Sequence, residues 1–175
     1  MANTNLQPSQ VTVPTKLIPL SQGKFAIVDK ADFEWLSQWK WHYHNGYAKR
    51  TQWDGVINGK RTTHKVWLHR EVNKTPKGFH TDHVNGDPLD NRRENLRKAT
   101  PVENTRNSKM PSDNTSGYKG VRLHKHLVSK PWSARIANNR VTKHLGCFAT
   151  PQEAYAVYAQ AAKELHGEYY RECKL

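Results

Sequence analysis

Residues 79–97 read FHTDHVNGDPLDNRRENLR, and Asp, Asn, Arg and His supply most of the side chains. Hydrolysis of a phosphodiester needs a base to generate hydroxide and a hard cation beside the scissile phosphate. A histidine suits the first task, and one carboxylate with one amide suffices for a Mg²⁺ ion that keeps several waters. Asp82 and His83 supply a carboxylate and an imidazole, and the stretch also contains asparagine amides. The stretch therefore indicates metal-dependent phosphodiester chemistry.

A polar turn is the alternative interpretation of the same residues. Asn85-Gly86-Asp87-Pro88 is strong turn chemistry, and Asp and Asn also cap helices. Asp82 and His83 are adjacent, so on a regular strand their side chains point to opposite faces. Both reach one phosphate only where the end of the strand twists or bends. The Asp-His pair alone leaves the two interpretations open.

The complete pattern is more specific. Asp82-His83-x-Asn-Gly-x-x-x-Asp-Asn-Arg-x-x-Asn95-Leu96-Arg97, followed by Thr100 and Glu103-Asn104, resembles the motif of HNH homing endonucleases. Leu68-His69-Arg70 also resembles the element that precedes this motif in phage members. The resemblance implies a ββα-metal fold, in which two short strands and a helix surround one divalent ion. It implies that Asp82 and Asn104 are metal ligands, that His83 is the general base, and that Asn95 shapes the loop and orients the histidine.

Some members of that family have a histidine where this chain has Asn104. An amide oxygen is a neutral hard ligand that suits Mg²⁺ or Mn²⁺ better than Zn²⁺. We expect one divalent cation, Mg²⁺ or Mn²⁺, and no structural zinc. The His80-x-x-His83 spacing leaves a zinc site as the alternative, but no cysteine lies nearby and we favour a loop or phosphate contact for His80.

The net charge of +13 and the pI near 9.9 point to a polyanionic partner, and we expect double-stranded DNA. Residues 1–66 have nine Lys and Arg against four Asp and Glu, residues 67–116 have nine against seven, and residues 117–175 have ten against four. A nearly balanced middle with basic flanks is expected where the middle holds a carboxylate-bearing metal site and the flanks hold phosphates. A merely basic surface is the alternative.

Composition limits which other classes of protein the chain can belong to. The hydrophobic fraction of 35% and mean hydropathy of −0.92 exclude one large core, so aromatic anchors should supply much of the buried area. The sequence has no run of 18 apolar residues, no secretion signal and no Cys-x-x-Cys pair. We expect a protein of the phage-infected or bacterial cytoplasm that has no membrane partner.

Residues 118–148 contain seven Lys and Arg and no acid, whereas every acid of the C-terminal region lies at or beyond Glu153. Three strands (118–124, 132–137 and 140–148) precede a helix with Thr150 as N-cap, Pro151 next, Glu153 completing a capping box and Gly167 as its stop. A three-stranded sheet with one basic face and the helix on the other explains this division of charge. Strand alternation places Ser133 and Arg135 on the outer face.

The same region resembles the Apetala-type (ethylene-response-factor) DNA-binding domain over about residues 116–170. The resemblance rests on YKGVR (118–122), WSARI (132–136), LG-x-F-x-T (145–150) and the helix from Glu153 to Gly167. It implies base reading by the sheet, with Arg122 as the best base-reading candidate. An ordinary basic α+β surface or a protein-binding module is the alternative. The side chains that we expect at DNA are Arg122, Arg135, Lys119, His124, Arg140, His144, Arg92 and Arg97.

The sequence therefore predicts an α+β protein with a central ββα-metal module, followed by a three-stranded antiparallel sheet packed on one helix. We divide it into a flexible leader (1–16), an N-terminal α+β segment (17–66), the HNH nuclease module (67–107), a linker (108–116) and the Apetala-type DNA-binding domain (117–175). Within the N-terminal segment we expect a strand at 24–29, a helix at 31–39, and a hairpin of strands 41–51 and 61–66.

The leading functional hypothesis is a site-preferring DNA endonuclease whose C-terminal sheet docks it on its target. The HNH resemblance implies a free-standing homing enzyme. One HNH centre per chain implies that a monomer nicks one strand. Cleavage of both strands then needs a weak dimer or two sequential events. A DNA-binding transcription regulator with an inactive HNH remnant is the alternative. An RNA-binding or RNA-cleaving protein is a third hypothesis.

Overall fold

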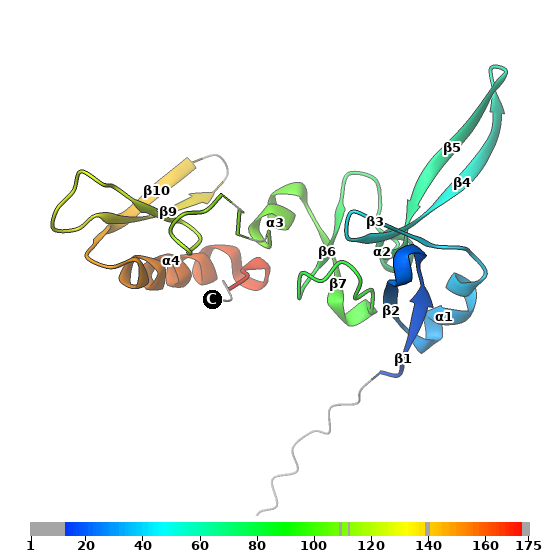
Figure 1. Ribbon diagram of the computed structural model, residues 1–175, viewed down its shortest axis with the longest axis horizontal. Helices are drawn as coiled ribbons and strands as arrows, with labels where there is room; N and C mark the ends of the chain where they lie inside the picture. Colours follow the sequence, from blue (N-terminus) through cyan, green and yellow to red (C-terminus); the bar gives the residue numbers. More distant parts are fainter. Residues whose placement is uncertain (1–12, 109, 112, 139–140, 173–175) are drawn as a thin grey trace, which may run out of the picture. The chain divides into compact units, whose positions relative to one another are not determined.

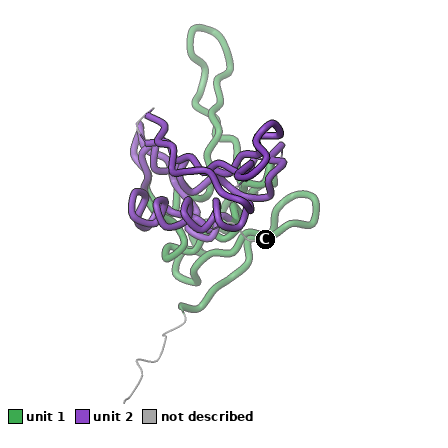
Figure 2. The backbone as a smooth tube through the Cα atoms, turned by 90° about the vertical axis from the view of Figure 1, so that its left-hand side faces the viewer, with its two compact units in different colours: residues 1–74, 87–97 green, residues 75–86, 98–175 purple. Residues whose placement is uncertain are grey.

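The computed structural model describes residues 13–108, 110–111, 113–138 and 141–172 (Figure 1). The chain is a mixed α/β protein with small antiparallel sheets and a few helices, as the sequence predicts. It divides into two compact units (Figure 2): Met1–Lys74 with Asp87–Arg97, and Thr75–Gly86 with Lys98–Leu175. Most of the expected leader lies outside the described residues, and the first strand already begins at Thr15.

Unit 1 begins with strands β1 (Thr15–Pro19) and β2 (Phe25–Asp29), joined by a short 3-10 turn, η1 (Ser21–Gly23). Helix α1 (Lys30–Ser37) follows directly. Leu36 and Trp41 are buried with Ile18 and Val28 in the core of this unit. The helix predicted at 31–39 ends at Ser37, and Trp39 is exposed beyond it, where the Arg50 guanidinium lies over the Trp39 ring.

The sheet of unit 1 has the order β3-β4-β5. The predicted strand 41–51 is two strands, β3 (His42–His44) and β4 (Tyr47–Ile57), because Asn45 and Gly46 both take positive φ in a tight turn. Asn58-Gly59 makes the predicted turn into β5 (Lys60–Trp67). Helix α2 (Leu68–Asn73) ends this part of the unit. The β4–β5 hairpin projects far from the remainder of unit 1 (Figure 1).

The segment 87–97 returns the chain to unit 1. The Ile27 backbone N–H donates to the Leu89 carbonyl (2.8 Å), and the Asn91 N–H donates to the Ile27 carbonyl (2.8 Å). This segment contains the 3-10 turn η2 (Arg93–Asn95) and runs into β7 (Leu96–Ala99), which pairs with β6 (His80–His83) in a two-stranded sheet. Strand β7 straddles the border between the units.

Helix α3 (Pro101–Arg106) follows β7 in unit 2, and the sequence at its N-terminus strongly favours a helix start. Thr100 and Glu103 form a reciprocal capping box, and Pro101 occupies the first helical position. The Thr100 hydroxyl accepts from the Glu103 N–H (3.3 Å), and the Glu103 carboxylate accepts from the Thr100 N–H (2.7 Å). These caps fix where α3 starts.

The C-terminal part of unit 2 is a sheet with the order β10-β9-β8, and its strands are Val141–Phe148, Trp132–Asn138 and Val121–Leu123. Helix α4 (Pro151–His166) contacts all three strands, and a 3-10 turn, η3 (Gly167–Tyr169), follows. Thr150 caps α4 as predicted, but the Glu153 carboxylate accepts from the Ala149 N–H rather than from that of Thr150. No helix in the described part of the chain is long and apolar enough to cross a membrane.

Candidate active site

Strand β6 carries Asp82 and His83, and both are buried, with exposed fractions of 5% and 6%. The strand ends at His83, where the backbone turns at once and the Gly86 N–H donates to the His83 carbonyl (2.8 Å). The strand therefore ends in a turn directly after the Asp82-His83 pair. Both side chains are withdrawn from bulk water, which strengthens the electrostatic interactions that they make.

Asn107 joins β6 to helix α3. Its amide nitrogen donates to Asp82 Oδ1 (2.7 Å) and to the His83 carbonyl (2.8 Å), and the residue is itself buried. Asn107 follows the last turn of α3 and is three residues after Asn104, so the two side chains lie on one side of the helix. The sequence interpretation missed Asn107, although this spacing was a signal for it.

Asn104 lies on α3 and is half-buried. Its amide nitrogen lies 3.4 Å from Nδ1 of His80, at the start of β6. His80 and Asp82 share one face of β6 because they are two residues apart. Asn104 on α3 therefore lies beside His80, and Asn107, just after α3, binds Asp82 and the His83 carbonyl.

The donors gathered there are of the kind that a hard divalent cation takes. Asp82 accepts from Asn107 through Oδ1, and a carboxylate has two oxygens with about four lone-pair sites. Amide oxygens from Asn104 and Asn107 are further hard ligands. Among the described residues, no group of three or more His, Cys, Asp or Glu could hold a metal. One carboxylate with amides and water fits Mg²⁺ or Mn²⁺.

Asn95 belongs to unit 1, in η2, and is buried. Its amide donates to the Asp90 carbonyl (2.8 Å), which closes the loop between residues 90 and 95. The Asp90 carboxylate holds Arg92 through Nε (2.8 Å) and Nη2 (2.7 Å), and Glu94 also binds Arg92. The hydrogen bonds that Arg92 donates to Asp90 raise the pKa of Arg92 above its ordinary value. The Arg92 guanidinium is thus committed to carboxylates of its own loop.

Arg93 anchors the same loop to α1. Its guanidinium donates to both oxygens of Asp32 (2.6 and 2.7 Å), and its backbone N–H donates to Asp29 (3.0 Å). Burial alone would raise the pKa of Asp32, but the hydrogen bonds from Arg93 and Trp35 outweigh it and lower that pKa below 3.8. This ion pair fixes the loop that contains Asn95.

Four residues define what we call the basic sheet face of unit 2: Arg122, His124, Arg135 and His144. In the strand register Arg122 opposes Ser133 and His144 opposes Arg135, so these positions share one side of the sheet. Ser133 is buried rather than exposed, because the His124 imidazole lies over it and hydrogen-bonds its hydroxyl (2.8 Å). Burial, followed by the charges of Arg122 and Arg135, lowers the pKa of His124.

The remaining expected DNA contacts are more scattered. Lys119 donates through Nζ to the carbonyls of Arg106 and Ser108, so it ties the segment before β8 to the end of α3. Arg97 is half-buried on β7. Arg140 lies outside the described residues. Within the described chain, the basic sheet face is where four of the expected DNA contacts lie together.

Comparison with known proteins agrees with this chemistry. Residues 62–106 match the HNH endonuclease family. The chain is 28% identical over 160 residues to a protein named "Uncharacterized HNH endonuclease L560" from Acanthamoeba polyphaga mimivirus, covering 87% of this chain and 76% of that protein. It is 35% identical over 96 residues to "Protein 3.8" of Escherichia phage T7, covering 55% of this chain and 77% of that protein. The chain therefore belongs to the HNH endonuclease family and is a nuclease.

Proposed function

We propose that this nuclease is a divalent-metal-dependent DNA endonuclease whose centre is built on β6 and α3. HNH nucleases generally use a divalent metal, and the endonuclease family implies a DNA substrate. The observation that carries the proposal is the buried Asp82-His83 pair joined to α3 through Asn107. The basic surface and the charge of +13 support a polyanionic substrate.

The residues divide the chemistry among them. His83 accepts a proton from the attacking water and so acts as the general base. Asp82 and Asn104 would hold Mg²⁺ or Mn²⁺, and Asn107 orients the Asp82 carboxylate toward it. A cation bound there would stabilise the charge on the scissile phosphate and on the leaving oxygen. Asn95 holds the loop between residues 90 and 95 in shape.

We propose that the basic sheet face docks the enzyme on DNA, in the manner of the Apetala-type domains that residues 116–170 resemble. Arg122 and Arg135 are exposed and can pair bidentately with guanine in the major groove. Arg97, Lys119 and Arg140 are secondary candidates, and Arg92 is the weakest because two carboxylates already bind its guanidinium.

The β4–β5 hairpin gives unit 1 its own surface for DNA. Trp53 is 63% exposed, and Val56 and Ile57 near the tip are also exposed. The strand partners of Val56 and Ile57 are Arg61 and Lys60. A two-stranded ribbon fits a DNA groove, cations meet phosphates, and an exposed indole can stack on a base. The proposal gives part of the N-terminal segment a function in DNA binding.

Metal dependence is tested on supercoiled plasmid and on linear duplexes that carry the region flanking the gene. EDTA should stop cleavage, and added Mg²⁺ or Mn²⁺ should restore it, because the donors are oxygens. Asp82→Asn should raise the metal concentration required for cleavage, whereas Asp113→Asn, in the segment after α3, should not. Cleavage that persists in EDTA, or that returns only with Zn²⁺, contradicts the proposed ligand set.

DNA docking is tested by gel shift and salt titration on the same duplex. Arg122→Ala should weaken binding or relax its sequence preference by roughly 1–3 kcal/mol if Arg122 contacts a base. Lys163→Ala removes one charge from the outer side of α4 and is the matched control. A loss that appears only as a smaller salt slope would make Arg122 a phosphate contact.

We further propose that the enzyme is a free-standing homing endonuclease acting as a monomer or weak dimer. Strand-resolved mapping of cuts near its own gene tests both statements, because one centre per monomer nicks one strand per event. A transcription regulator with an inactive HNH remnant is the rival. It predicts tight, specific binding with no cleavage in any metal.

A further inference from the structure

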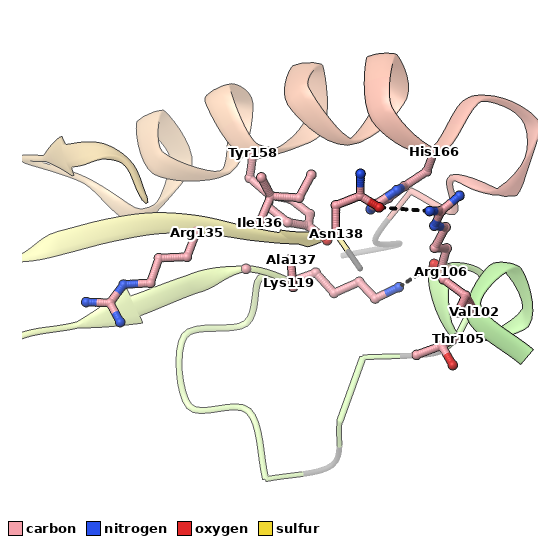
Figure 3. Close-up of a pocket in the computed structure, with 11 residues that line it drawn as sticks. Val102, Thr105, Arg106, Lys119, Arg135, Ile136, Ala137, Asn138, Tyr158 and His166 are labelled. Atoms are coloured by element: carbon pink, nitrogen blue, oxygen red, sulfur yellow. Dashed lines mark hydrogen bonds between the residues drawn. The ribbon is translucent and has the colours of Figure 1, made fainter. Parts of the chain in front are cut away.

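A second site lies in unit 2, apart from Asp82 and His83. A pocket of about 430 Å³ opens between α3, strand β9 and helix α4 (Figure 3). Lys119, Arg106 and His166 contribute nitrogen-bearing side chains to its lining, together with Asn138. No Asp or Glu is among the described residues that line it. The pocket is therefore positive, and a carboxylate does not neutralise it from within.

Its polar groups are arranged around one end. Arg106 Nη2 donates to the Asn138 side-chain carbonyl (3.0 Å), which fixes the guanidinium at the mouth of the pocket. Figure 3 shows Arg106, Asn138 and His166 converging there, whereas the Arg135 side chain points away. Lys119 holds the end of α3 in place through the Arg106 and Ser108 carbonyls. Arg106 has five N–H donors in a planar fork, so one bond to Asn138 leaves capacity for an oxyanion.

His166 supplies the observation that points to a ligand. The residue is 8% exposed, and its Nδ1 is buried without a hydrogen-bond partner among the described residues. A buried polar atom without a partner costs free energy that a ligand can recover. Burial and the neighbouring charges of Arg106 and Lys119 lower the pKa of His166 and outweigh a backbone hydrogen bond at Leu165 that raises it, so the pocket itself resists a further positive charge. An anion that accepts from Arg106 and His166 would offset this positive charge.

We propose that this pocket binds a phosphate group, with Arg106 and His166 as its donors. Planar guanidinium and imidazole N–H groups suit a tetrahedral oxyanion, and the absence of lining carboxylates fits an anion. The phosphate comes either from the DNA backbone or from free inorganic phosphate. Arg106 lies two residues after Asn104, so an occupied pocket holds in place the helix that carries this proposed metal ligand. Only the DNA source depends on the proposed function.

The test is calorimetric titration of the full chain with inorganic phosphate, with EDTA present and at constant ionic strength. Saturable one-to-one binding is expected, with a shift of the His166 ring nitrogens in ¹⁵N NMR. His166→Gln and Arg106→Gln should each weaken binding about tenfold or more, as expected for one charge-assisted hydrogen bond. His42→Gln, an exposed histidine of β3, is the matched control. Absence of saturable binding overturns the site, and so does binding that neither variant affects.

Asn138→Asp provides a second test in case His166→Gln or Arg106→Gln folds poorly. It keeps an oxygen acceptor for Arg106 and nearly the same shape, but it places a negative charge in the pocket, so phosphate binding should be lost. Retained affinity in this variant overturns the proposal. A DNA titration identifies the source: phosphate that displaces duplex from wild type more than from His166→Gln indicates a backbone phosphate. Phosphate that binds without displacing DNA indicates the free ion. Neither measurement requires cleavage.

Discussion

The amide of Asn107 donates hydrogen bonds to Asp82 Oδ1 (2.7 Å) and to the His83 carbonyl (2.8 Å). One side chain at the end of α3 thus holds both neighbouring residues of β6. The distance between strand and helix at this point sets the distance between Asp82 and Asn104. Asn107 is therefore a positioning residue for the proposed metal site.

Replacing Asn107 tests that role. Asn107→Leu keeps the volume but removes the donor, so it should cost about 1–3 kcal/mol of unfolding free energy because a buried carboxylate loses a partner. It should also lower metal affinity about 10- to 100-fold, as expected for the loss of a residue that orients a ligand. Urea unfolding and metal titration of cleavage measure the two effects. Thr105→Val, on the exposed side of α3, is the control, and a stability loss with unchanged metal affinity would make Asn107 merely structural.

The capping box of α3 should affect both stability and activity. Thr100→Ala removes the acceptor for the Glu103 N–H and should destabilise the protein by about 1 kcal/mol. Because α3 carries Asn104, cleavage should also need more metal. Glu103→Gln keeps a side-chain acceptor for the Thr100 N–H and should change both quantities less. Equal effects of the two variants in urea unfolding would contradict this account of the cap.

Acid sensitivity of unit 1 should depend on Asp32. Its pKa is below 3.8 in the folded state, so its contribution to stability is present above pH 3.8 and is lost as pH falls through the folded pKa. Asp32→Asn should therefore lower the unfolding free energy near pH 7, and the difference from wild type should shrink below pH 3.8. Unfolding curves across pH measure this, with exposed Glu34→Gln as the control. A difference independent of pH would contradict the ion pair with Arg93.

Gly120 should tolerate no side chain. Its φ is +71°, and an added Cβ would lie 2.2 Å from the Tyr158 ring and 2.8 Å from the Arg135 carbonyl. Gly117 has a similar φ of +75° but nothing within 4 Å of an added Cβ. Gly120→Ala should thus be about 1–3 kcal/mol more destabilising than Gly117→Ala, the excess being the steric term alone. Thermal unfolding compares them, and equal losses would contradict the close approach of α4 to this segment.

Local signals predicted much of the fold. Asn58-Gly59 predicted the β4–β5 turn, and Thr150, Pro151 and Gly167 predicted the ends of α4. Asn45-Gly46 has the same turn chemistry. The alternation of aromatic and polar residues runs through it, however, and predicts one long strand over 41–51. The Thr100 and Glu103 capping box is also a local signal in the sequence, and it marks the start of α3.

Contacts between distant residues were beyond local patterns. The pairing of residues 89–91 with Ile27 depends on backbone groups more than sixty residues apart, and no side-chain period records it. The same is true of the Arg93–Asp32 pair, which anchors the loop of Asn95 to α1. His124 covering Ser133 likewise required the observed register of β8 and β9. Sequence patterns could therefore name the chemical groups but not which of them were already engaged.

The proposed role of His83 is tested most directly by single-turnover cleavage of one duplex in Mg²⁺, with binding to that duplex measured separately in EDTA. His83→Ala should slow cleavage by about 10²- to 10⁴-fold, the contribution of a general base, and leave DNA affinity unchanged. His42→Ala should cleave as wild type does. If His83→Ala cleaves at the wild-type rate, His83 is not the base. If wild type and variant are equally inert in every metal while both bind DNA, the regulator account stands.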